Sequence, residues 1–311
     1  MERHAVDRPV EREYRHLVFD NRRWQLFVPR ADDIFVCTPP KCGTTWMQTI
    51  VVELLFPDGA PGPVTEISPW IDARIEPVDS LMARLDGQPH RRTLKTHTPA
   101  DGIPWYPSAS YIVVGRDGRD AFMSYWNHWH NIRREALPRM ATTAAEDGIT
   151  ARLPPVDDLH EFFAWWLDEF PLWFEHVASF WSHRGEPNVL FAHYNDMQAD
   201  LDREMRRVAS FLGVSVDEQR WTSQVQHCTF ASMKARSDEI GSFDRGFVGG
   251  ADTFLYKATN GRWRDVLTEA ELAAFDRRCE ERLPPDAFAW TVNGGTSERS
   301  LTQYLPPTSH A

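Results

Sequence analysis

The stretch Ile34–Leu55 constrains the fold more than any other part of the chain. It begins with a short apolar run, Ile34–Thr38, which is typical of a buried strand. A turn-rich connection follows, and from Thr44 the apolar residues recur at helical spacing. A strand that leads through a short loop into a helix N-terminus forms an anion site, because the first N–H groups of the helix are unpaired. The sequence therefore predicts an α/β unit with an anion-binding loop, to which Lys41 adds a positive charge.

This loop differs from the P-loop of nucleoside triphosphatases, which places its lysine after the second glycine, at the start of the helix. Here Lys41 precedes Gly43, the only glycine of the loop. Taken alone, the pattern also fits an ordinary strand–turn–helix whose lysine has no chemical role. The other motifs of the chain have to decide between these interpretations.

Charge and cysteine content exclude several classes of protein. The 311 residues have a net charge of −11, which argues against nucleic acid or an anionic membrane as the main partner. The four cysteines have neither zinc-site spacing nor the pattern of a disulfide framework, so we expect a reducing, cytoplasmic location and no metal site. We expect no signal peptide and no membrane span, because the charged N-terminus lacks an apolar segment and no apolar run is long enough.

The run TPPKCGTTW, residues 38–46, resembles a motif of the sulfotransferases that use 3′-phosphoadenosine 5′-phosphosulfate (PAPS). The family pattern is TYPKSGTTW, so Pro40 and Cys42 replace a tyrosine and a serine. The resemblance implies that Lys41 stabilises the leaving nucleotide during transfer. It also implies that the 5′-phosphate is held by the hydroxyls and N–H groups of Cys42, Gly43, Thr44 and Thr45, with Trp46 beside the adenine.

Residues 92–99, RTLKTHTP, are typical of a short strand that runs into a turn. A lone histidine in a loop is usually not catalytic. The run is similar, however, to the family motif KTHxP, which stands intact here. The resemblance implies that His97 is the general base, for which its ordinary pKa near 6.5 is suitable. It implies that Lys95 assists at the sulfuryl group.

A second strand–turn–helix junction follows the apolar strand Tyr111–Val114. Arg116 lies in the charged turn, and Ser124 lies eight residues later in the predicted helix. The simpler interpretation is a solvated turn that caps a helix. The identities and spacing resemble the family motif for the 3′-phosphate, for which an arginine is suitable because its planar fork donates two hydrogen bonds to one phosphate. Nearby, His128 and His130 are two residues apart and cannot share a helix face, so we expect no metal there.

Two later segments resemble family motifs that approach the nucleotide. The turn HYNDM, residues 193–197, is similar to YEDM, which implies that Tyr194 contacts the nucleotide. The run CTFASMK, residues 228–234, is similar to TSFxxMK and implies an adenine site formed by Cys228, Thr229, Phe230 and Met233. Phe230 and Trp46 would enclose the adenine ring, whereas a cysteine at 228 would lack the hydroxyl donor of the family's threonine.

The largest departure from the family lies at residues 256–264, where the family pattern is RKGxxGDWK. Tyr256 replaces the arginine and Ala258 replaces the first glycine. Lys257 remains as the clear cation for the 3′-phosphate, and Arg262 is the candidate to compensate. We therefore expect weaker or differently arranged 3′-phosphate binding, since one charge-assisted hydrogen bond is worth about 1.5–3 kcal/mol.

The resemblance covers about residues 30–290 and implies a single α/β domain with a central parallel sheet flanked by helices, a P-loop-like sulfotransferase architecture. We expect this domain at residues 31–292, after an N-terminal extension (1–30) and before a loose C-terminal tail (293–311). Residues 133–155 are expected to be a long loop, either disordered or a lid. The family's dimer motif, KxxxTVxxxE, is not matched by Arg264, Thr268, Glu269 and Ala273, so the oligomeric state is open.

The predicted reaction is transfer of the sulfuryl group of PAPS to a hydroxyl or amine of a small-molecule acceptor, without a metal. The aromatic content of the chain favours an apolar or aromatic acceptor, although most aromatic residues are expected in the core. Two alternatives remain. The chain could bind the product nucleotide, 3′-phosphoadenosine 5′-phosphate (PAP), without catalysis. It could also be a P-loop phosphotransferase, although it lacks the later lysine and magnesium ligands of that class.

Overall fold

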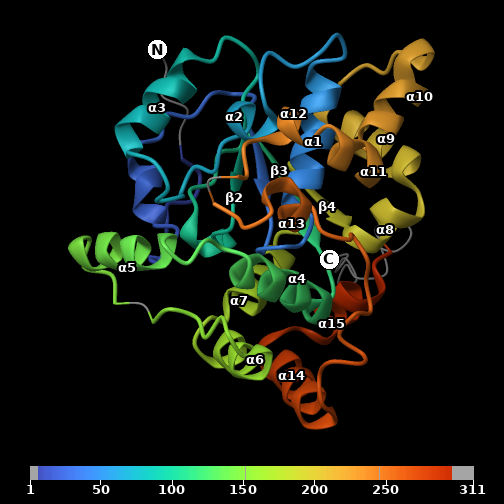
Figure 1. Cartoon of the computed structure of the whole chain (residues 1–311). Helices are drawn as coiled ribbons and strands as arrows, with labels where there is room; N and C mark the ends of the chain where they lie inside the picture. Colours follow the sequence, from blue (N-terminus) through green and yellow to red (C-terminus); the bar gives the residue numbers. More distant parts are fainter. Residues whose placement is uncertain (1–5, 151, 245, 296–311) are drawn as a thin grey trace, which may run out of the picture.

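The centre of the molecule is a parallel sheet of four strands (Figure 1). The computed structural model describes residues 6–150, 152–244 and 246–295. Across the sheet the order is β2 (Thr93–Thr96), β1 (Ile34–Cys37), β3 (Ser110–Gly115) and β4 (Val189–His193). All neighbouring pairs are parallel. This confirms the predicted α/β fold with a central parallel sheet.

The two faces of the sheet belong to two separate cores. Because successive residues of a strand point to opposite faces, Val36 lies in one core and Phe35 in the other. The first core contains side chains of α1 (Thr44–Leu55), α9 (Leu201–Leu212) and α10 (Glu218–His227). The second is rich in aromatic rings from α4 (Gly118–His130), α6 (Leu159–Asp168), α7 (Leu172–Trp181) and α14 (Glu269–Arg282). Helices therefore cover both faces, as Figure 1 shows.

Several helix boundaries agree with local signals in the sequence. Pro171 separates α6 from α7, because a proline cannot donate the hydrogen bond that a continuous helix needs. Gly213 ends α9 with a φ of 64°. Thr268 and Glu271 form the predicted capping box of α14. The remaining helices are η1 (Asn21–Leu26), α2 (Val64–Ile67), α3 (Val78–Gly87), η2 (Ala100–Gly102), α5 (Ala136–Glu146), α8 (Tyr194–Ala199), α11 (Phe230–Ala235), α12 (Ser237–Ile240), α13 (Gly250–Phe254) and α15 (Pro285–Asn293).

The described part of the N-terminal segment is packed into the second core. Tyr14, Phe19 and Trp24 are buried there. Asn21 ties the segment down, since its side chain accepts a hydrogen bond from the Tyr14 N–H at 2.8 Å and donates one to the Gly102 carbonyl at 2.7 Å. These aromatic residues have no helical or strand periodicity, and so the sequence did not indicate that they are core residues. Residues 1–5 of the predicted N-terminal extension and residues 296–311 of the predicted C-terminal tail lie outside the described residues.

The expectation of a long loop at residues 133–155 is wrong for its first half, which forms helix α5. Its alanines favour a helix, and Leu137 and Ala144 supply a buried stripe two turns long. Arg74 holds the end of this helix, donating to the Thr143 carbonyl at 2.6 Å and to the Asp147 carboxylate. The stripe is too sparse to be recognised as amphipathic from the sequence.

The four cysteines are free and buried. Among the described residues, no helix has both the length and the apolar character needed to cross a membrane.

Candidate active site

Each of the four strands delivers a predicted site residue at its carboxyl end. Lys41 follows β1, His97 follows β2, Arg116 follows β3 and Tyr194 follows β4. Because the strands are parallel, these four ends meet at one edge of the sheet, where α/β proteins bind ligands. All four residues line a cavity of about 490 Å³.

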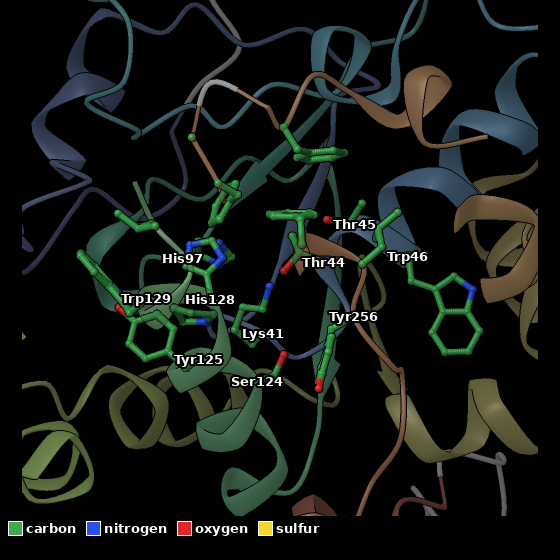
Figure 2. Close-up of a pocket in the computed structure, with 18 of the residues that line it drawn as sticks. Lys41, Thr44, Thr45, Trp46, His97, Ser124, Tyr125, His128, Trp129 and Tyr256 are labelled. Atoms are coloured by element: carbon green, nitrogen blue, oxygen red, sulfur yellow. The ribbon is translucent and has the colours of Figure 1, made fainter. Parts of the chain in front are cut away.

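Most of the other predicted site residues line the same cavity. Figure 2 shows Lys41 between two groups of side chains, with His97, Tyr125 and His128 on one side and Thr44, Thr45 and Trp46 on the other. The predicted residues that line it are Lys41, Gly43, Thr44, Thr45, Trp46, Lys95, His97, Arg116, Ser124, Tyr194, Phe230, Met233 and Lys257. The fold thus gathers six separate segments of the chain around one space.

Three predicted residues, Cys42, Cys228 and Thr229, do not line this cavity. The Cys42 side chain is fully buried, and burial raises the pKa of its thiol to about 12. Cys228 acts through its backbone, because its carbonyl accepts a 2.7 Å hydrogen bond from the Trp46 indole N–H. Thr229 caps α11 by accepting a hydrogen bond from the Ser232 N–H. The substitution of cysteine at 228 therefore removes no hydroxyl from the cavity wall.

The loop before α1 is held in an unusual backbone conformation. Lys41 has a φ of 68°, which is rare for a residue other than glycine, and Gly43 has a φ of 101°. Arg116 stabilises this turn, since its Nη1 donates to the Lys41 carbonyl at 3.0 Å. The Lys41 ammonium lies 4.6 Å from the centre of the Phe254 ring. Burial, with the charges of Lys95 and Arg116, lowers the pKa of Lys41 to about 7.

His97 is oriented by the backbone of the strand beside it. Its Nδ1 lies 2.7 Å from the Thr38 carbonyl oxygen, which can only accept, so Nδ1 carries the proton and Nε2 is left with a free lone pair. The expectation of an ordinary pKa is wrong for the protein alone, because burial and the charge of Lys95 lower the pKa of His97 to about 3. The imidazole is therefore neutral and can accept a proton.

Trp70 and Asp72, which belong to none of the sequence motifs, support His97 and Lys95 from the segment before β2. The centres of the Trp70 and His97 rings are 4.7 Å apart in an edge-on arrangement. The Lys95 ammonium lies 4.9 Å from the centre of the Trp70 ring. The Trp70 indole N–H donates to the buried carboxylate of Asp72. Burial raises the pKa of Asp72, while burial lowers the pKa of Lys95 to about 8.

Asp72 is further held by Thr96 and Thr98, which flank His97 in the chain and donate their hydroxyls to the carboxylate. Two threonines of the KTHTP run thus donate to the same buried carboxylate, which fixes the turn that carries His97. Only the packing of residues 70–72 against β2 reveals this role. No local motif contains it.

Arg116 is the centre of a polar network at the other end of the cavity. Its guanidinium donates to the Asn260 side-chain oxygen at 2.7 and 3.1 Å and lies 4.0 Å from the centre of the Tyr194 ring. The Asn260 amide in turn donates to the side chains of Asn195 and Gln198. Arg116 thus directs two N–H donors at one neutral oxygen, which is the arrangement with which an arginine binds a phosphate.

The residues that depart from the family pattern lie at this same corner. Ala258, where the family has glycine, adopts a φ of 50°, so the backbone keeps a conformation that glycine accepts more readily. Tyr256 and Arg262 both line the cavity, and the Arg262 guanidinium lies 5.3 Å from the centre of the Tyr256 ring. Burial and the charge of Arg116 lower the pKa of Arg262.

The cavity gathers positive charge in a chain that is acidic overall. Lys41, Lys95, Arg116, Lys257 and Arg262 all line it. Among the described residues, none of these five has a carboxylate within 4.0 Å, although the chain has 45 acidic side chains. Unpaired cations in a partly buried space are costly without an anion, so this end of the cavity fits a ligand with several negative charges.

The other end of the cavity is apolar and is built largely from residues outside the sequence motifs. Phe19 comes from the N-terminal segment, Met140 from α5, and Phe247 and Phe254 from the glycine-rich segment after α12. His128 lines this end, while His130 is exposed and contacts the Val156 carbonyl. Within the described residues, no group of three His, Cys, Asp or Glu side chains could hold a metal ion.

Comparison with known proteins identifies the family. The sequence matches the family model described as "Sulfotransferase domain" over residues 31–285. The chain belongs to the sulfotransferase family. This confirms the predicted family and class of enzyme. Similar curated proteins include the glycolipid sulfotransferase of Mycobacterium tuberculosis (strain H37Ra), which is 35% identical over 90% of this chain and 94% of its own length. Sulfotransferase 1C2 of Rattus norvegicus is 27% identical, over 83% of this chain and 86% of its own length.

Solved structures of proteins in complex with PAP have the same fold. Mouse sulfotransferase SULT7A1 complexed with PAP superposes with a TM-score of 0.66, at 20% identity, covering 94% of this chain and 98% of that one. Retinol dehydratase in complex with androsterone and inactive cofactor PAP gives a TM-score of 0.67, at 20% identity, covering 86% and 87%. At these identities the likeness establishes the fold alone.

Proposed function

We propose that this sulfotransferase moves the sulfuryl group of PAPS to a hydroxyl, or an amine, of a small-molecule acceptor. The observation that carries the proposal is the combination of unpaired cations with His97, whose Nε2 is free because Nδ1 donates to the Thr38 carbonyl. The cations suit the phosphates and the sulfuryl group of the donor. The neutral imidazole suits a base. The donor is a co-substrate, and the proposed reaction uses no metal.

The proposed nucleotide site runs from the Lys41 loop to the corner around Arg116. Thr44 and Thr45 lie at the N-terminus of α1, where backbone N–H groups favour a phosphate at the 5′ position. Arg116 and Ser124 would hold the 3′-phosphate, with Asn260 displaced or turned to donate its amide. Trp46, Tyr194, Phe230 and Met233 would enclose the adenine.

Arg262 is the proposed replacement for the family arginine that is lost at Tyr256. It lines the cavity close to Arg116, and Lys257 is next to that corner in the chain. We expect Arg262→Gln to weaken PAP binding about tenfold to a hundredfold, which corresponds to one charge-assisted hydrogen bond. Binding of ADP, which lacks a 3′-phosphate, should change little. Equal weakening of both nucleotides would reject this role.

In the proposed reaction the acceptor oxygen attacks sulfur in line with the bridging oxygen of PAPS. The bond between sulfur and the acceptor oxygen forms as the bond to the bridging oxygen breaks, and PAP leaves. The acceptor proton passes to Nε2 of His97. Lys41 stabilises the negative charge that grows on the bridging oxygen, and Lys95 stabilises the sulfuryl oxygens. The phosphate and sulfate charges of the bound donor would raise the pKa of His97 from its low value, making it a stronger base.

The acceptor side of the cavity supports an acceptor with an apolar part. Phe19, Phe170 and Met140 line it, and the similar mycobacterial proteins are named glycolipid sulfotransferases. We propose an acceptor that combines a hydroxylated group near His97 with apolar substituents. The free thiols support the cytoplasm as the proposed location.

The second candidate function is binding of PAP without catalysis. The loss of the family arginine at Tyr256 favours it, because that change weakens a contact to the nucleotide and leaves the binding loop intact. Two measurements together separate the two candidates. Calorimetric titration with PAP, with ADP as control, measures the nucleotide site, and transfer of radioactive sulfur from PAPS to an acceptor panel measures catalysis.

For a sulfotransferase we expect PAP to bind much more tightly than ADP and sulfur to be transferred. His97→Ala should bind PAP normally and lose turnover. If a folded His97→Ala protein loses PAP binding, the assignment of His97 as the base is contradicted. If PAP binds tightly to the wild type but no acceptor receives sulfur, the binding protein is the better candidate.

A further inference from the structure

His128 is a histidine of the cavity for which the proposed reaction has no use. It lies on α4, four residues after Ser124, and lines the acceptor side. Figure 2 shows it beside His97, and the two imidazoles are close enough for the charge of one to affect the other. Its spacing from His130 argues against a metal site, so this histidine has no role in the predicted chemistry.

The surroundings of the His128 ring are aromatic. Its neighbours are the rings of Phe247 at 4.7 Å, Phe254 at 5.9 Å and Tyr125 at 6.4 Å. Burial, with the charges of Lys41 and Lys95, holds the pKa of His128 well below its ordinary value, so the ring is neutral. The side chain is therefore a neutral hydrogen-bonding group in an otherwise apolar wall.

The ring makes no hydrogen bond within the described protein. Its Nδ1 is buried without a partner, which leaves Nε2 as the atom that the ring can offer to the cavity. An unpaired polar group in apolar surroundings costs roughly 1–3 kcal/mol by mutational measures. A phenylalanine would fill such a wall at no such cost. The imidazole is therefore explained by a polar partner that arrives with the ligand.

We propose that His128 binds the acceptor through a second hydroxyl, next to the one that reacts. The inference rests on the proposed function. The reacting oxygen is already surrounded by His97, by the sulfur that it attacks and by Lys95, so His128 is left for a neighbouring group. If Nε2 has the lone pair, the hydroxyl donates to it, and if Nε2 carries the proton, the hydroxyl accepts from it. The pairing therefore does not depend on which ring nitrogen carries the proton.

The preferred acceptor is then a vicinal diol on a ring. The walls around it, which include Trp70, Trp129 and Phe170, suit the flat face of a phenol ring or the apolar face of a sugar. Ile75 and Met140 both line the cavity, and Ile75 is 68% exposed, which places it at the opening. An alkyl chain attached to the diol would leave the cavity past these side chains.

Matched acceptor pairs test this inference. The first pair is 4-butylcatechol and 4-butylphenol, and the second is octyl glucoside and octanol, so that an aromatic source of the diol is distinguished from a sugar. For at least one pair, wild-type kcat/KM should be about tenfold to a hundredfold higher for the diol, because the acceptor with a single hydroxyl leaves His128 without a hydrogen bond. His128→Phe keeps the shape of the wall and should abolish this preference. His128→Gln, whose side chain can place a polar atom near Nε2, should retain most of it.

Two controls keep the result specific. Tyr125→Phe, which removes the neighbouring hydroxyl and leaves His128 in place, should keep the diol preference. The affinity for PAP should be unchanged in both His128 variants, which also shows that they are folded. The inference is overturned if the wild type prefers neither diol, or if His128→Phe keeps the preference. Failure of PAP binding and of all transfer in the wild type would instead overturn the proposed function.

Discussion

The binding of PAP should depend on pH through Lys41. This lysine lies in the loop after β1, and burial together with the charges of Lys95 and Arg116 lowers its pKa to about 7. A bound phosphate stabilises the charged ammonium and returns its pKa towards the ordinary value. Since the nucleotide binds the protonated form, affinity is highest below the pKa of the free protein and falls as the pH rises through it.

The magnitude follows from the fraction of protein in which Lys41 is charged. With a pKa of about 7, about half of the protein is charged at pH 7 and about one hundredth at pH 9. The dissociation constant for PAP should therefore rise about 50-fold over this interval, which is about 2 kcal/mol. The phosphates of PAP do not contribute, because their second ionisation lies near pH 6.

The assay is calorimetric titration with PAP at several pH values, each in two buffers of different ionisation heat, so that proton uptake is measured directly. Near pH 8 most of one proton should be taken up per PAP bound. Lys41→Arg keeps its charge throughout and should bind PAP with little dependence on pH. Lys95→Met should retain the dependence, because Lys95 is proposed to contact the sulfuryl group that PAP lacks. The midpoint should move to slightly higher pH, because the charge of Lys95 helps to lower the pKa of Lys41. A flat profile for the wild type without proton uptake would refute the reasoning.

Three predictions concern stability and can be checked by urea unfolding. Gly43→Ala should destabilise the protein by about 1–2 kcal/mol, because φ is 101° there, and unchanged stability would contradict the assignment of this turn. Ala258→Gly should stabilise it by about 0.5–1 kcal/mol, since a φ of 50° suits glycine better, and a loss of stability would show that no strain is stored there. Arg92→Met should cost about 3–5 kcal/mol because it leaves the buried carboxylate of Asp33 unpaired, and a neutral result would mean that water reaches that pair.

The parts of the site that the sequence predicted are those in which one short segment carries both the fold signal and the chemistry. The Lys41 loop is such a segment, because an apolar strand, a turn and a helix start follow each other directly. The turn with Arg116 is another. In both, the local order of residues determines the structure, and the parallel sheet then brings the two turns together.

The parts that the sequence missed depend on contacts between distant segments. Trp70 and Asp72 reach His97 only because their segment packs beside β2. Asn260 contacts Arg116 across 144 positions of the chain. The effect of burial on pKa also depends on the complete cavity, so the low pKa of His97 could not be read from its motif. Such properties arise from packing, which no local pattern records.

The most direct test of the central claim is transfer of radioactive sulfur from PAPS to an alkyl catechol or alkyl glucoside, comparing the wild type with His97→Ala. We expect a labelled acceptor and an equal amount of PAP with the wild type. We expect no labelled acceptor above background with the variant, at unchanged affinity for PAP. Equal transfer by both proteins would contradict the account, because the reaction would then proceed without the base on which it is built.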